Sequence, residues 1–293
     1  MTPAPLEAEP NWALARRHAA GATSARGLLL TALGELVLPT GGSAWTSAFV
    51  DVFSRLRVEE KAIRQALTRT VTDGWISPER HGRRTRWWLT RAGEELLTEG
   101  AERIYTFASP QRDWDGSWLL VLARVPETNR PARHRLRTRL SWAGLGTPAP
   151  GLWVTTHTER KDEVAHVLRQ VGVTEGHIFL AEHQGGAELF TLVAGAWDLP
   201  AIEQRYKEFL TEFASPICGD PLARVIALVH AWRRFPSIDP GLPARLLPRE
   251  WSGAEAARLF AARHAAWVPE ALAEWRLLNT RAGTLTGAGR PGR

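Results

Sequence analysis

Apolar positions at helical spacing mark three consecutive segments near the start of the chain. Residues 24–38 and 43–56 each place their apolar side chains on one stripe, and a Pro-Thr-Gly-Gly break separates them. In residues 58–75 the stripe consists of Ile63, Ala66, Leu67, Thr70 and Val71. The pattern predicts three helices, each with one buried face, and makes Ser43 a candidate N-cap of the second helix.

A two-stranded hairpin is expected directly after the third helix. The segments "GWISPE" and "TRWWLT" are rich in β-branched and aromatic residues, and Gly82 lies between them at the expected turn. Asp73 and Gly74 end the preceding helix, and a further helix is expected over residues 91–104. Three helices, a hairpin and a fourth helix follow one another in the order of a winged helix-turn-helix domain, predicted here for residues 23–107.

Cationic and amide side chains are concentrated on the third helix and on the hairpin. Residues 61–91 hold eight Lys and Arg against two acids, an excess of six that equals the formal charge of the whole chain. The face opposite the apolar stripe carries donors of the kind that reach bases and phosphates. The residues predicted to contact double-stranded DNA are Lys61, Arg64, Gln65, Thr68, Arg69, Arg80, His81, Arg83, Arg84 and Arg86. A solvated charged face and a solvated hairpin are the plainer alternative.

Strands alternate with short helices in residues 114–196. "SWLLVLARVPE", "GLWVTTH" and "GHIFLAEH" are expected strands, and "AELFTLVAG" is expected to extend the same sheet. Helices are expected at "RPARHRLRTRLSWAG", with Leu136 and Leu140 on the inner face, and at "RKDEVAHVLRQVGV". This alternation predicts a small α+β sandwich of ferredoxin-like outline. Residues 197–278 form a third region that is expected to be all helical, with several prolines between its helices.

Composition limits the remaining possibilities. A chain of 293 residues is long enough for two or three domains. The single cysteine, Cys218, excludes internal disulfides and fits a reducing, cytoplasmic location. Residues 1–22 and 279–293 have the composition of disordered tails, and no apolar run is long enough for a transmembrane helix. The overall prediction is an α+β chain with a winged helix-turn-helix domain, a ferredoxin-like domain and a helical domain.

The sequence resembles the PaaX-type repressors of phenylacetate catabolism. Three segments carry the resemblance: "LLLTALGELVLPTGGSAW" with "IRQALTRTVTDGWISPERHGRRTRWWLT", then "SWLLVLARVPETNRPARHRLRTRLSWAGLGTPAPGLWV", and finally "LVHAWRRFPSIDPGLPARLLPREWSGAEAARLF". The middle segment is similar to the family's Cas2-like domain. The resemblance spans roughly residues 24–267. It implies a homodimeric repressor that binds an inverted-repeat operator and is released by phenylacetyl-CoA or a related aryl-CoA, without a cofactor.

Enzymatic alternatives are weaker. Cas2-like nucleases use an acid at the end of the first strand, where this chain has Val125 and Pro126 with Glu127 beyond them. His177, Glu182 and His183 are metal-ligand types, but on one strand the two histidines would lie about 20 Å apart. We therefore expect neither catalytic nor metal-binding residues. A non-catalytic nucleic-acid-binding module or a residual metal-dependent nuclease, each based on the middle domain, is the alternative function.

A ligand site is expected in the third region. "VIALVHAWRRF" places Val225, Leu228, Val229 and Trp232 inward on a helix, and an acyl-CoA needs an apolar slot beside cations for its phosphates. The predicted ligand-binding residues are His230, Trp232, Arg233 and Arg234. The structural alternative is that His230 or Arg233 pairs with a carboxylate such as Asp239.

Overall fold

The structure, a computed structural model, describes residues 24–107, 114–173, 175–185, 187–215 and 219–284. The chain divides into two compact units, and each unit is assembled from separate segments of the sequence. The first takes the residues up to Ile104, Phe209–Trp232 and the residues from Ala257 onward. The second takes Tyr105–Glu208 and Arg233–Ala256. The C-terminal helical region, which the sequence predicts as a domain of its own over residues 197–278, is therefore shared between the two units.

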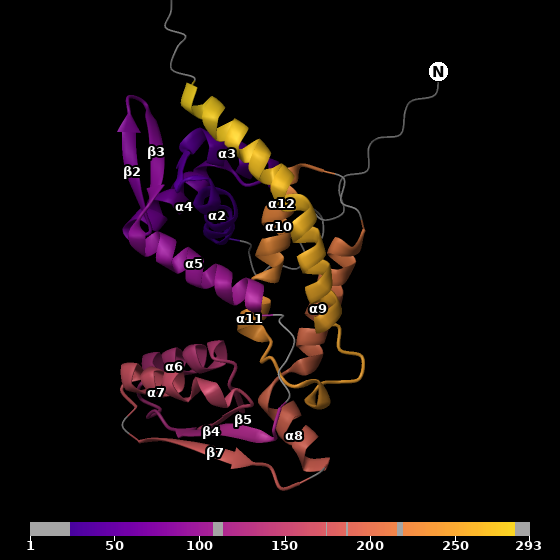
Figure 1. Cartoon of the computed structure of the whole chain (residues 1–293). Helices are drawn as coiled ribbons and strands as arrows, with labels where there is room; N and C mark the ends of the chain where they lie inside the picture. Colours follow the sequence, from indigo (N-terminus) through magenta and orange to yellow (C-terminus); the bar gives the residue numbers. More distant parts are fainter. Residues whose placement is uncertain (1–23, 108–113, 174, 186, 216–218, 285–293) are drawn as a thin grey trace, which may run out of the picture. The chain divides into compact units, whose positions relative to one another are not determined.

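Helices and a small sheet build the first unit (Figure 1). The N-terminal elements are α2 (Ala25–Ala32), a π-helical turn (Leu33–Val37), a 3-10 turn (Leu38–Thr40), β1 (Ser43–Trp45), α3 (Thr46–Arg55), α4 (Glu60–Thr72), β2 (Ile76–His81), β3 (Arg84–Leu89) and α5 (Arg91–Thr106). The later segments add α10 (Pro221–Trp232) and α12 (Gly253–Thr284), whose first residues belong to the second unit.

The predicted helical stripes form the core of the first unit. The Ser24 hydroxyl caps α2 by accepting a hydrogen bond from the Gly27 amide at 3.1 Å. On α4 the residues Ile63, Ala66, Leu67 and Thr70 are buried, as the spacing predicts. The expected cap at Ser43 is wrong, because this residue lies in β1 and α3 begins after Trp45 without a side-chain cap.

Three antiparallel strands form a small sheet in the order β1-β3-β2. Its β2–β3 hairpin is called the wing below. Gly82 makes the turn with φ of 60°, a left-handed conformation that glycine adopts without strain. At the base of the hairpin, α5 packs closely against Trp75. A side chain at Gly93 would place its Cβ 2.0 Å from the Trp75 carbonyl oxygen, so only glycine fits there.

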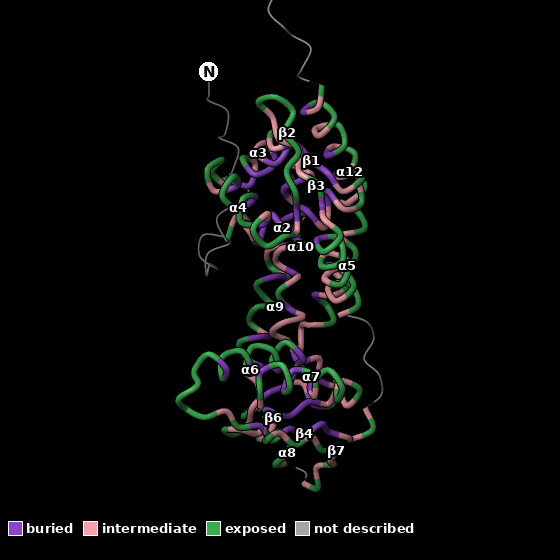
Figure 2. The backbone as a smooth tube through the Cα atoms, turned by 90° about the vertical axis from the view of Figure 1, so that its left-hand side faces the viewer, coloured by how far each residue is buried: buried purple, intermediate pink, exposed green. Residues whose placement is uncertain are grey.

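Helix α10 is buried on nearly all sides in the first unit (Figure 2). It contacts α2 and α3, and its all-round apolar sequence is typical of a central helix. Helix α12 also packs on the N-terminal elements: Trp275 lies 5.7 Å from Phe49, ring centroid to centroid, and its Nε1 donates to Thr40 Oγ1 at 3.1 Å. The helix-turn-helix elements therefore share one core with segments about 200 residues further along the chain.

A four-stranded antiparallel sheet in the order β5-β6-β4-β7 is the centre of the second unit. Its strands and helices alternate as in a ferredoxin-like fold, which confirms the predicted outline. The elements are β4 (Ser117–Ala123), α6 (Arg130–Trp142), β5 (Gly146–Ala149), β6 (Leu152–Thr155), a 3-10 turn (Thr158–Arg160), α7 (Lys161–Val171) and β7 (Gly176–Glu182). The expected strand at "AELFTLVAG" is wrong, because it forms helix α8 (Ala187–Ala196), which contacts β5.

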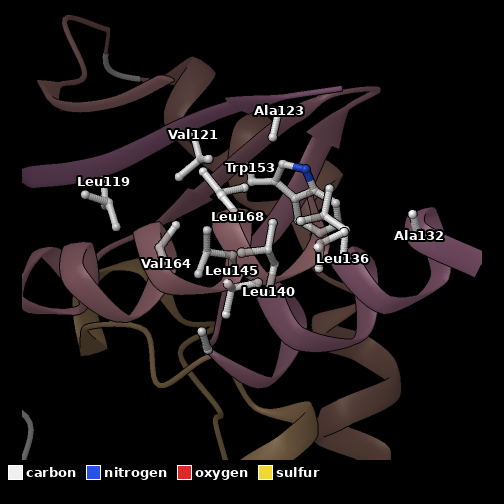
Figure 3. Packing of buried hydrophobic residues seen from close by; sticks show 13 residues of the cluster. Leu119, Val121, Ala123, Ala132, Leu136, Leu140, Leu145, Trp153, Val164 and Leu168 are labelled. Atoms are coloured by element: carbon white, nitrogen blue, oxygen red, sulfur yellow. The ribbon is translucent and has the colours of Figure 1, made fainter. Parts of the chain in front are cut away.

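Both helices of the sandwich pack on one face of that sheet. Leu119 and Val121 of β4 meet Leu136 and Leu140 of α6, together with Val164 of α7 (Figure 3). Each of these side chains is at most 4% exposed. Alternate residues of β4 thus form the sheet side of the core, and the buried stripes of α6 and α7 form its helical side.

The remaining helices of the chain are α9 (Leu199–Ala214) and the short α11 (Phe235–Ile238), followed by a 3-10 turn (Ala244–Leu246). Tyr206 of α9 stacks on Phe235 with ring centroids 4.1 Å apart, and its hydroxyl donates to Asp239 Oδ2 at 2.6 Å. Burial raises the pKa of Asp239, although the hydrogen bonds from Tyr206 and the Gly241 amide oppose that shift. These contacts hold the chain after α10 in the second unit.

Candidate nucleic-acid interface

Helix α4 turns its polar face entirely to solvent. The buried stripe fixes the rotation of the helix, so that the other side chains point outward. A shallow hollow that is open to solvent lies on this face. It is lined by Glu60, Lys61, Arg64, Gln65, Thr68 and Arg69, which include all five residues that the sequence predicts on this helix.

Most of the α4 donors are uncommitted. Arg64 pairs with Glu60 one turn earlier at 2.6 Å, an exposed pair of little energetic weight. The Thr68 hydroxyl donates to the Arg64 carbonyl at 3.0 Å. In the part of the chain that the structure describes, Lys61, Gln65 and Arg69 have no side-chain partner. The helix therefore presents three free donor side chains and a fourth that is only loosely paired.

The tip of the wing carries a second set of free cations. Arg80 and Arg83 are exposed, and neither has a side-chain partner among the described residues. His81 lies 3.3 Å from Glu79 and packs edge-on against Trp45, with ring centroids 5.2 Å apart. Hydrogen bonds from Trp88 and then from His81 lower the pKa of Glu79, which keeps this carboxylate charged within the hairpin.

Arg84 and Arg86 are already engaged within the first unit. Arg84 donates to the carbonyl oxygens of Ala282 at 2.5 Å and Gly283 at 3.1 Å, and its guanidinium lies 4.3 Å above the Trp45 ring. Arg86 donates to Ser43 Oγ at 2.8 Å. The predicted role of these two arginines at the phosphate backbone stays a prediction, but the structure gives each of them an internal partner.

The stem tryptophans are not equivalent. Trp87 is half-buried, and its Nε1 donates to Thr46 Oγ1 of α3 at 2.8 Å, as expected for a stem that packs on the helices. Trp88 is 37% exposed and stacks on Arg86, whose Cζ lies 4.4 Å from the ring centroid. Its side of the hairpin therefore faces solvent.

The C-terminal end of α12 holds the wing in place. The sequence predicts a disordered tail from residue 279, but the helix continues to Thr284. Asn279 explains the difference, since its Oδ1 accepts from the Trp45 amide and its Nδ2 donates to the Ser43 carbonyl, both at 3.0 Å. Arg84 then satisfies the last carbonyls of the helix. The predicted tail at residues 1–22 lies outside the described residues.

The four predicted ligand residues have different surroundings. Trp232 is 1% exposed, stacks on Phe260 at 4.7 Å between ring centroids and donates to the Ile104 carbonyl at 3.2 Å, so it has no surface for a ligand. His230 Nδ1 lies 3.4 Å from Thr31 Oγ1 of α2. Asp239, the carboxylate named in the structural alternative, accepts a hydrogen bond from Tyr206.

Arg233 and Arg234 follow directly after α10. Arg233 is half-buried, and burial followed by the charge of Arg234 lowers its pKa. Among the described residues, neither guanidinium has an acidic partner. The predicted role of these residues in ligand binding stays a prediction, and Arg233 and Arg234 are the two cations of the set.

His177, Glu182 and His183 are the metal-ligand types that the sequence offers in the middle region. Within the described ranges there is no group of three or more His, Cys, Asp or Glu side chains that could hold a metal ion. His183 Nδ1 lies 2.8 Å from the Gly185 carbonyl, and His177 stacks on Phe179. Cys218 lies outside the described residues. None of the described helices is long and apolar enough to cross a membrane.

An exposed donor face on a helix, followed by a hairpin with a cationic tip, is typical of a DNA-binding regulator. Comparison with known families is specific: residues 24–93 match the PaaX-like protein family, residues 111–193 the PaaX protein central Cas2-like domain, and residues 197–276 the PaaX-like protein C-terminal domain. The chain belongs to the PaaX family.

A curated repressor among the similar proteins agrees with this assignment. The transcriptional repressor PaaX of Escherichia coli (strain K12) is 28% identical over 275 residues, which cover 88% of this chain and 85% of the relative. Human protein SCO2 homolog, mitochondrial, is 29% identical over 135 residues, only 43% of this chain and 48% of its own length. The solved structure of the uncharacterized protein Rv0674 from Mycobacterium tuberculosis has the same fold, with a TM-score of 0.60, 21% identity and coverage of 87% of this chain and 100% of that one.

Proposed function

We propose that the protein is a cytoplasmic repressor of an aromatic-acid catabolic operon, that it binds an inverted-repeat operator as a homodimer, and that an aryl-CoA thioester releases it. One observation carries the DNA-binding part of this proposal. The free donors Lys61, Gln65 and Arg69 of α4 lie in the same winged-helix fold as the free cations Arg80 and Arg83 of the wing.

Helix α4 is the expected reader of the major groove. Arg64 and Gln65 project from its exposed face, where a guanidinium can bind guanine and a carboxamide can bind adenine in bidentate fashion. The pair between Arg64 and Glu60 is exposed and exchanges readily for a base contact. Arg80 and Arg83 at the tip of the wing would contact phosphates, which adds affinity without sequence preference.

The test compares binding to the DNA upstream of the protein's own gene with binding to a random duplex of equal length. Arg64→Ala or Gln65→Ala should weaken binding to the upstream region by about 1–3 kcal/mol and leave binding to random duplex unchanged. Fluorescence anisotropy at fixed salt measures both affinities. Equal losses on the two duplexes would restrict these residues to phosphate contacts, and no loss on either would exclude α4 as the reader. The upstream DNA should stay intact with Mg²⁺, whereas cleavage would favour a nuclease.

The homodimer follows from symmetry. Two copies related by a two-fold axis present two α4 helices and so bind two half-sites of an inverted repeat. Simultaneous engagement of both half-sites raises the apparent affinity well above that for one half-site. Sedimentation should give a dimer at micromolar concentration, and an operator cut to a single half-site should bind much more weakly. A monomer that binds the full operator tightly would contradict this part of the proposal.

The effector part rests on Arg233. A half-buried guanidinium without an acidic partner among the described residues is costly, and an anionic ligand would supply the missing charge. The phosphates of a CoA ester are suitable anions, and the relative named as the repressor PaaX makes an aryl-CoA of phenylacetate catabolism the first candidate. Arg234 would add a second cation at the exposed end.

Dissociation of the protein from operator DNA tests this effector directly. Phenylacetyl-CoA should dissociate the complex and free phenylacetate should not, because an effector must bind the DNA-free state better. Arg233→Ala should keep the DNA affinity and raise the concentration needed for release, whereas the exposed control Arg205→Ala should behave as wild type. If no acyl-CoA in a panel releases a tight complex, the effector is of another class.

A further inference from the structure

Helix α6 of the second unit carries an unusual density of exposed arginines that the proposed function does not use. Its residues Ala132, Leu136 and Leu140 are buried against the sheet. The remaining positions include five exposed arginines and one exposed histidine, namely Arg130, Arg133, His134, Arg135, Arg137 and Arg139. The helix contains no acidic residue.

Three other described helices each pair one cation with a glutamate four residues away, which α6 does not. Arg64 of α4, Arg91 of α5 and Lys207 of α9 each pair with a glutamate four residues away. On α6 the same spacing places arginine beside arginine, at Arg133 with Arg137 and again at Arg135 with Arg139. Like charges at this spacing destabilise a helix, so the free protein tolerates a repulsion that a bound polyanion would relieve.

The neighbourhood of α6 supplies little compensation. Arg133 donates to the backbone carbonyl of Glu127 at 3.2 Å, and Arg139 donates to the side-chain oxygen of Gln170. Both partners are neutral groups. Arg130, Arg135 and Arg137 have no side-chain partner among the described residues. Residues 124–142 hold six arginines against the single acid Glu127.

The spacing arranges the arginines in rows. Because a helix turns about 100° per residue, Arg130, Arg133 and Arg137 lie on one flank of the buried stripe, and Arg135 and Arg139 lie on the other. The first row is about 10 Å long, and each strand of a duplex carries one phosphate for about every 3.4 Å of helix axis. Arginine binds phosphate through two parallel hydrogen bonds, which suits a row of this kind to a nucleic-acid backbone.

We propose that the exposed face of α6 is a second binding surface for duplex DNA, which contacts phosphates and reads no bases. The inference rests on the proposed function, because a chain that binds no DNA would have no use for this contact. The face adds to the affinity and salt dependence of binding and leaves the choice of operator to α4.

The experiment uses the full chain and a long duplex of random sequence, so that only backbone contacts count. The variant replaces Arg130, Arg135 and Arg137 with Gln, which preserves helix propensity. The control replaces Arg205, Arg249 and Arg258 with Gln, three arginines that are also exposed and have no acidic partner among the described residues. Both variants lower the net charge equally, and circular dichroism verifies that both are folded.

Salt titration of binding gives the decisive number. Each phosphate contact contributes about 0.9 to the slope of log K against log salt, so the α6 variant should lose about 2–3 from the slope and bind at least tenfold more weakly at low salt. The control should keep the wild-type slope. Equal slopes for the α6 variant and the wild type, or equal losses in both variants, would overturn the inference.

The remaining outcomes separate this inference from the proposed function. Failure of the wild type to bind any duplex refutes the proposed function itself. Loss of operator preference in Gln65→Ala together with a wild-type slope in the α6 variant refutes only the role of α6. Normal DNA binding by the α6 variant with impaired release by an acyl-CoA would assign the arginines to the effector, and would also overturn the inference.

Discussion

Arginines of the first unit fall into two groups that the sequence does not distinguish. Arg80 and Arg83 extend from the wing without a described side-chain partner, whereas the adjacent Arg84 is bound to backbone carbonyls of α12. Arg64 has one exposed glutamate beside it, whereas Arg55 contacts the three carboxylates of Asp51, Asp220 and Glu274. The comparison shows that an arginine contributes to binding or to folding according to the groups that surround it, and each prediction below tests one side of that division.

The largest effect on stability is expected at Arg55. Arg55→Ala leaves Asp220 and Glu274 without their shared cation and should lower the free energy of unfolding by about 2 kcal/mol, less than for a fully buried ion pair. Arg64→Ala removes only an exposed pair and should change it by at most about 0.5 kcal/mol. Urea unfolding of both variants measures the difference. Similar losses in the two variants would abolish the distinction between the groups.

The tip of the wing should affect binding and not folding. Replacing Arg80 and Arg83 together with Ala should weaken binding to every duplex about tenfold and reduce the salt slope by about two, since each free cation accounts for one phosphate. The midpoint of urea unfolding should not change. An unaltered salt slope would show that the tip does not reach the backbone of DNA.

Arg84 should behave in the opposite way. Arg84→Ala leaves the carbonyls of Ala282 and Gly283 without their donor and should cost about 1–2 kcal/mol of stability. Asn279→Ala removes the neighbouring contacts with Trp45 and Ser43 and should cost a similar amount. The salt slope of DNA binding should remain that of the wild type in both. If Arg84→Ala alone reduced the salt slope by one, Arg84 would have to contact a phosphate after all.

The smallest effect concerns the charge of Glu79 in the stem of the wing. Its pKa is lowered from the ordinary 4.5 by the hydrogen bonds from Trp88 and His81, so its contribution to stability is present above that value and is lost as the pH falls through the lowered pKa. Glu79→Gln should lower the melting temperature slightly at neutral pH and match the wild type in strong acid. A difference that persists unchanged in acid would contradict a charge-dependent contact.

Local pattern was sufficient for much of the fold. The stripe of Ile63, Ala66 and Leu67 predicts the rotation of α4, and Gly82 predicts the turn of the wing, because both depend only on neighbouring residues. The strand expected at "AELFTLVAG" is helix α8 instead, since a short apolar run does not distinguish a strand from a helix.

Contacts between segments that are far apart in the chain could not be predicted from the local sequence pattern. Residues 279–284 have the composition of a tail, and they are helical because Trp45, Ser43 and Arg84 bind them. Trp232 is buried as its helical spacing predicts, but local spacing does not identify its partners, Phe260 and the Ile104 carbonyl. The exposed donors of α4 could be predicted, but the internal partners of Arg84 and Arg86 could not.

The hydrogen bond between Trp45 and Asn279 joins residues 234 positions apart, and this separation affects synthesis of the protein. Chains generally fold domain by domain from the N-terminus as they leave the ribosome. Here the wing and α3 come early, but their packing partners α10 and α12 come late. The first unit is therefore incomplete until α12 has been translated. A message cut short before residue 279 would yield no competent DNA-binding protein, although it encodes all of the predicted DNA contacts.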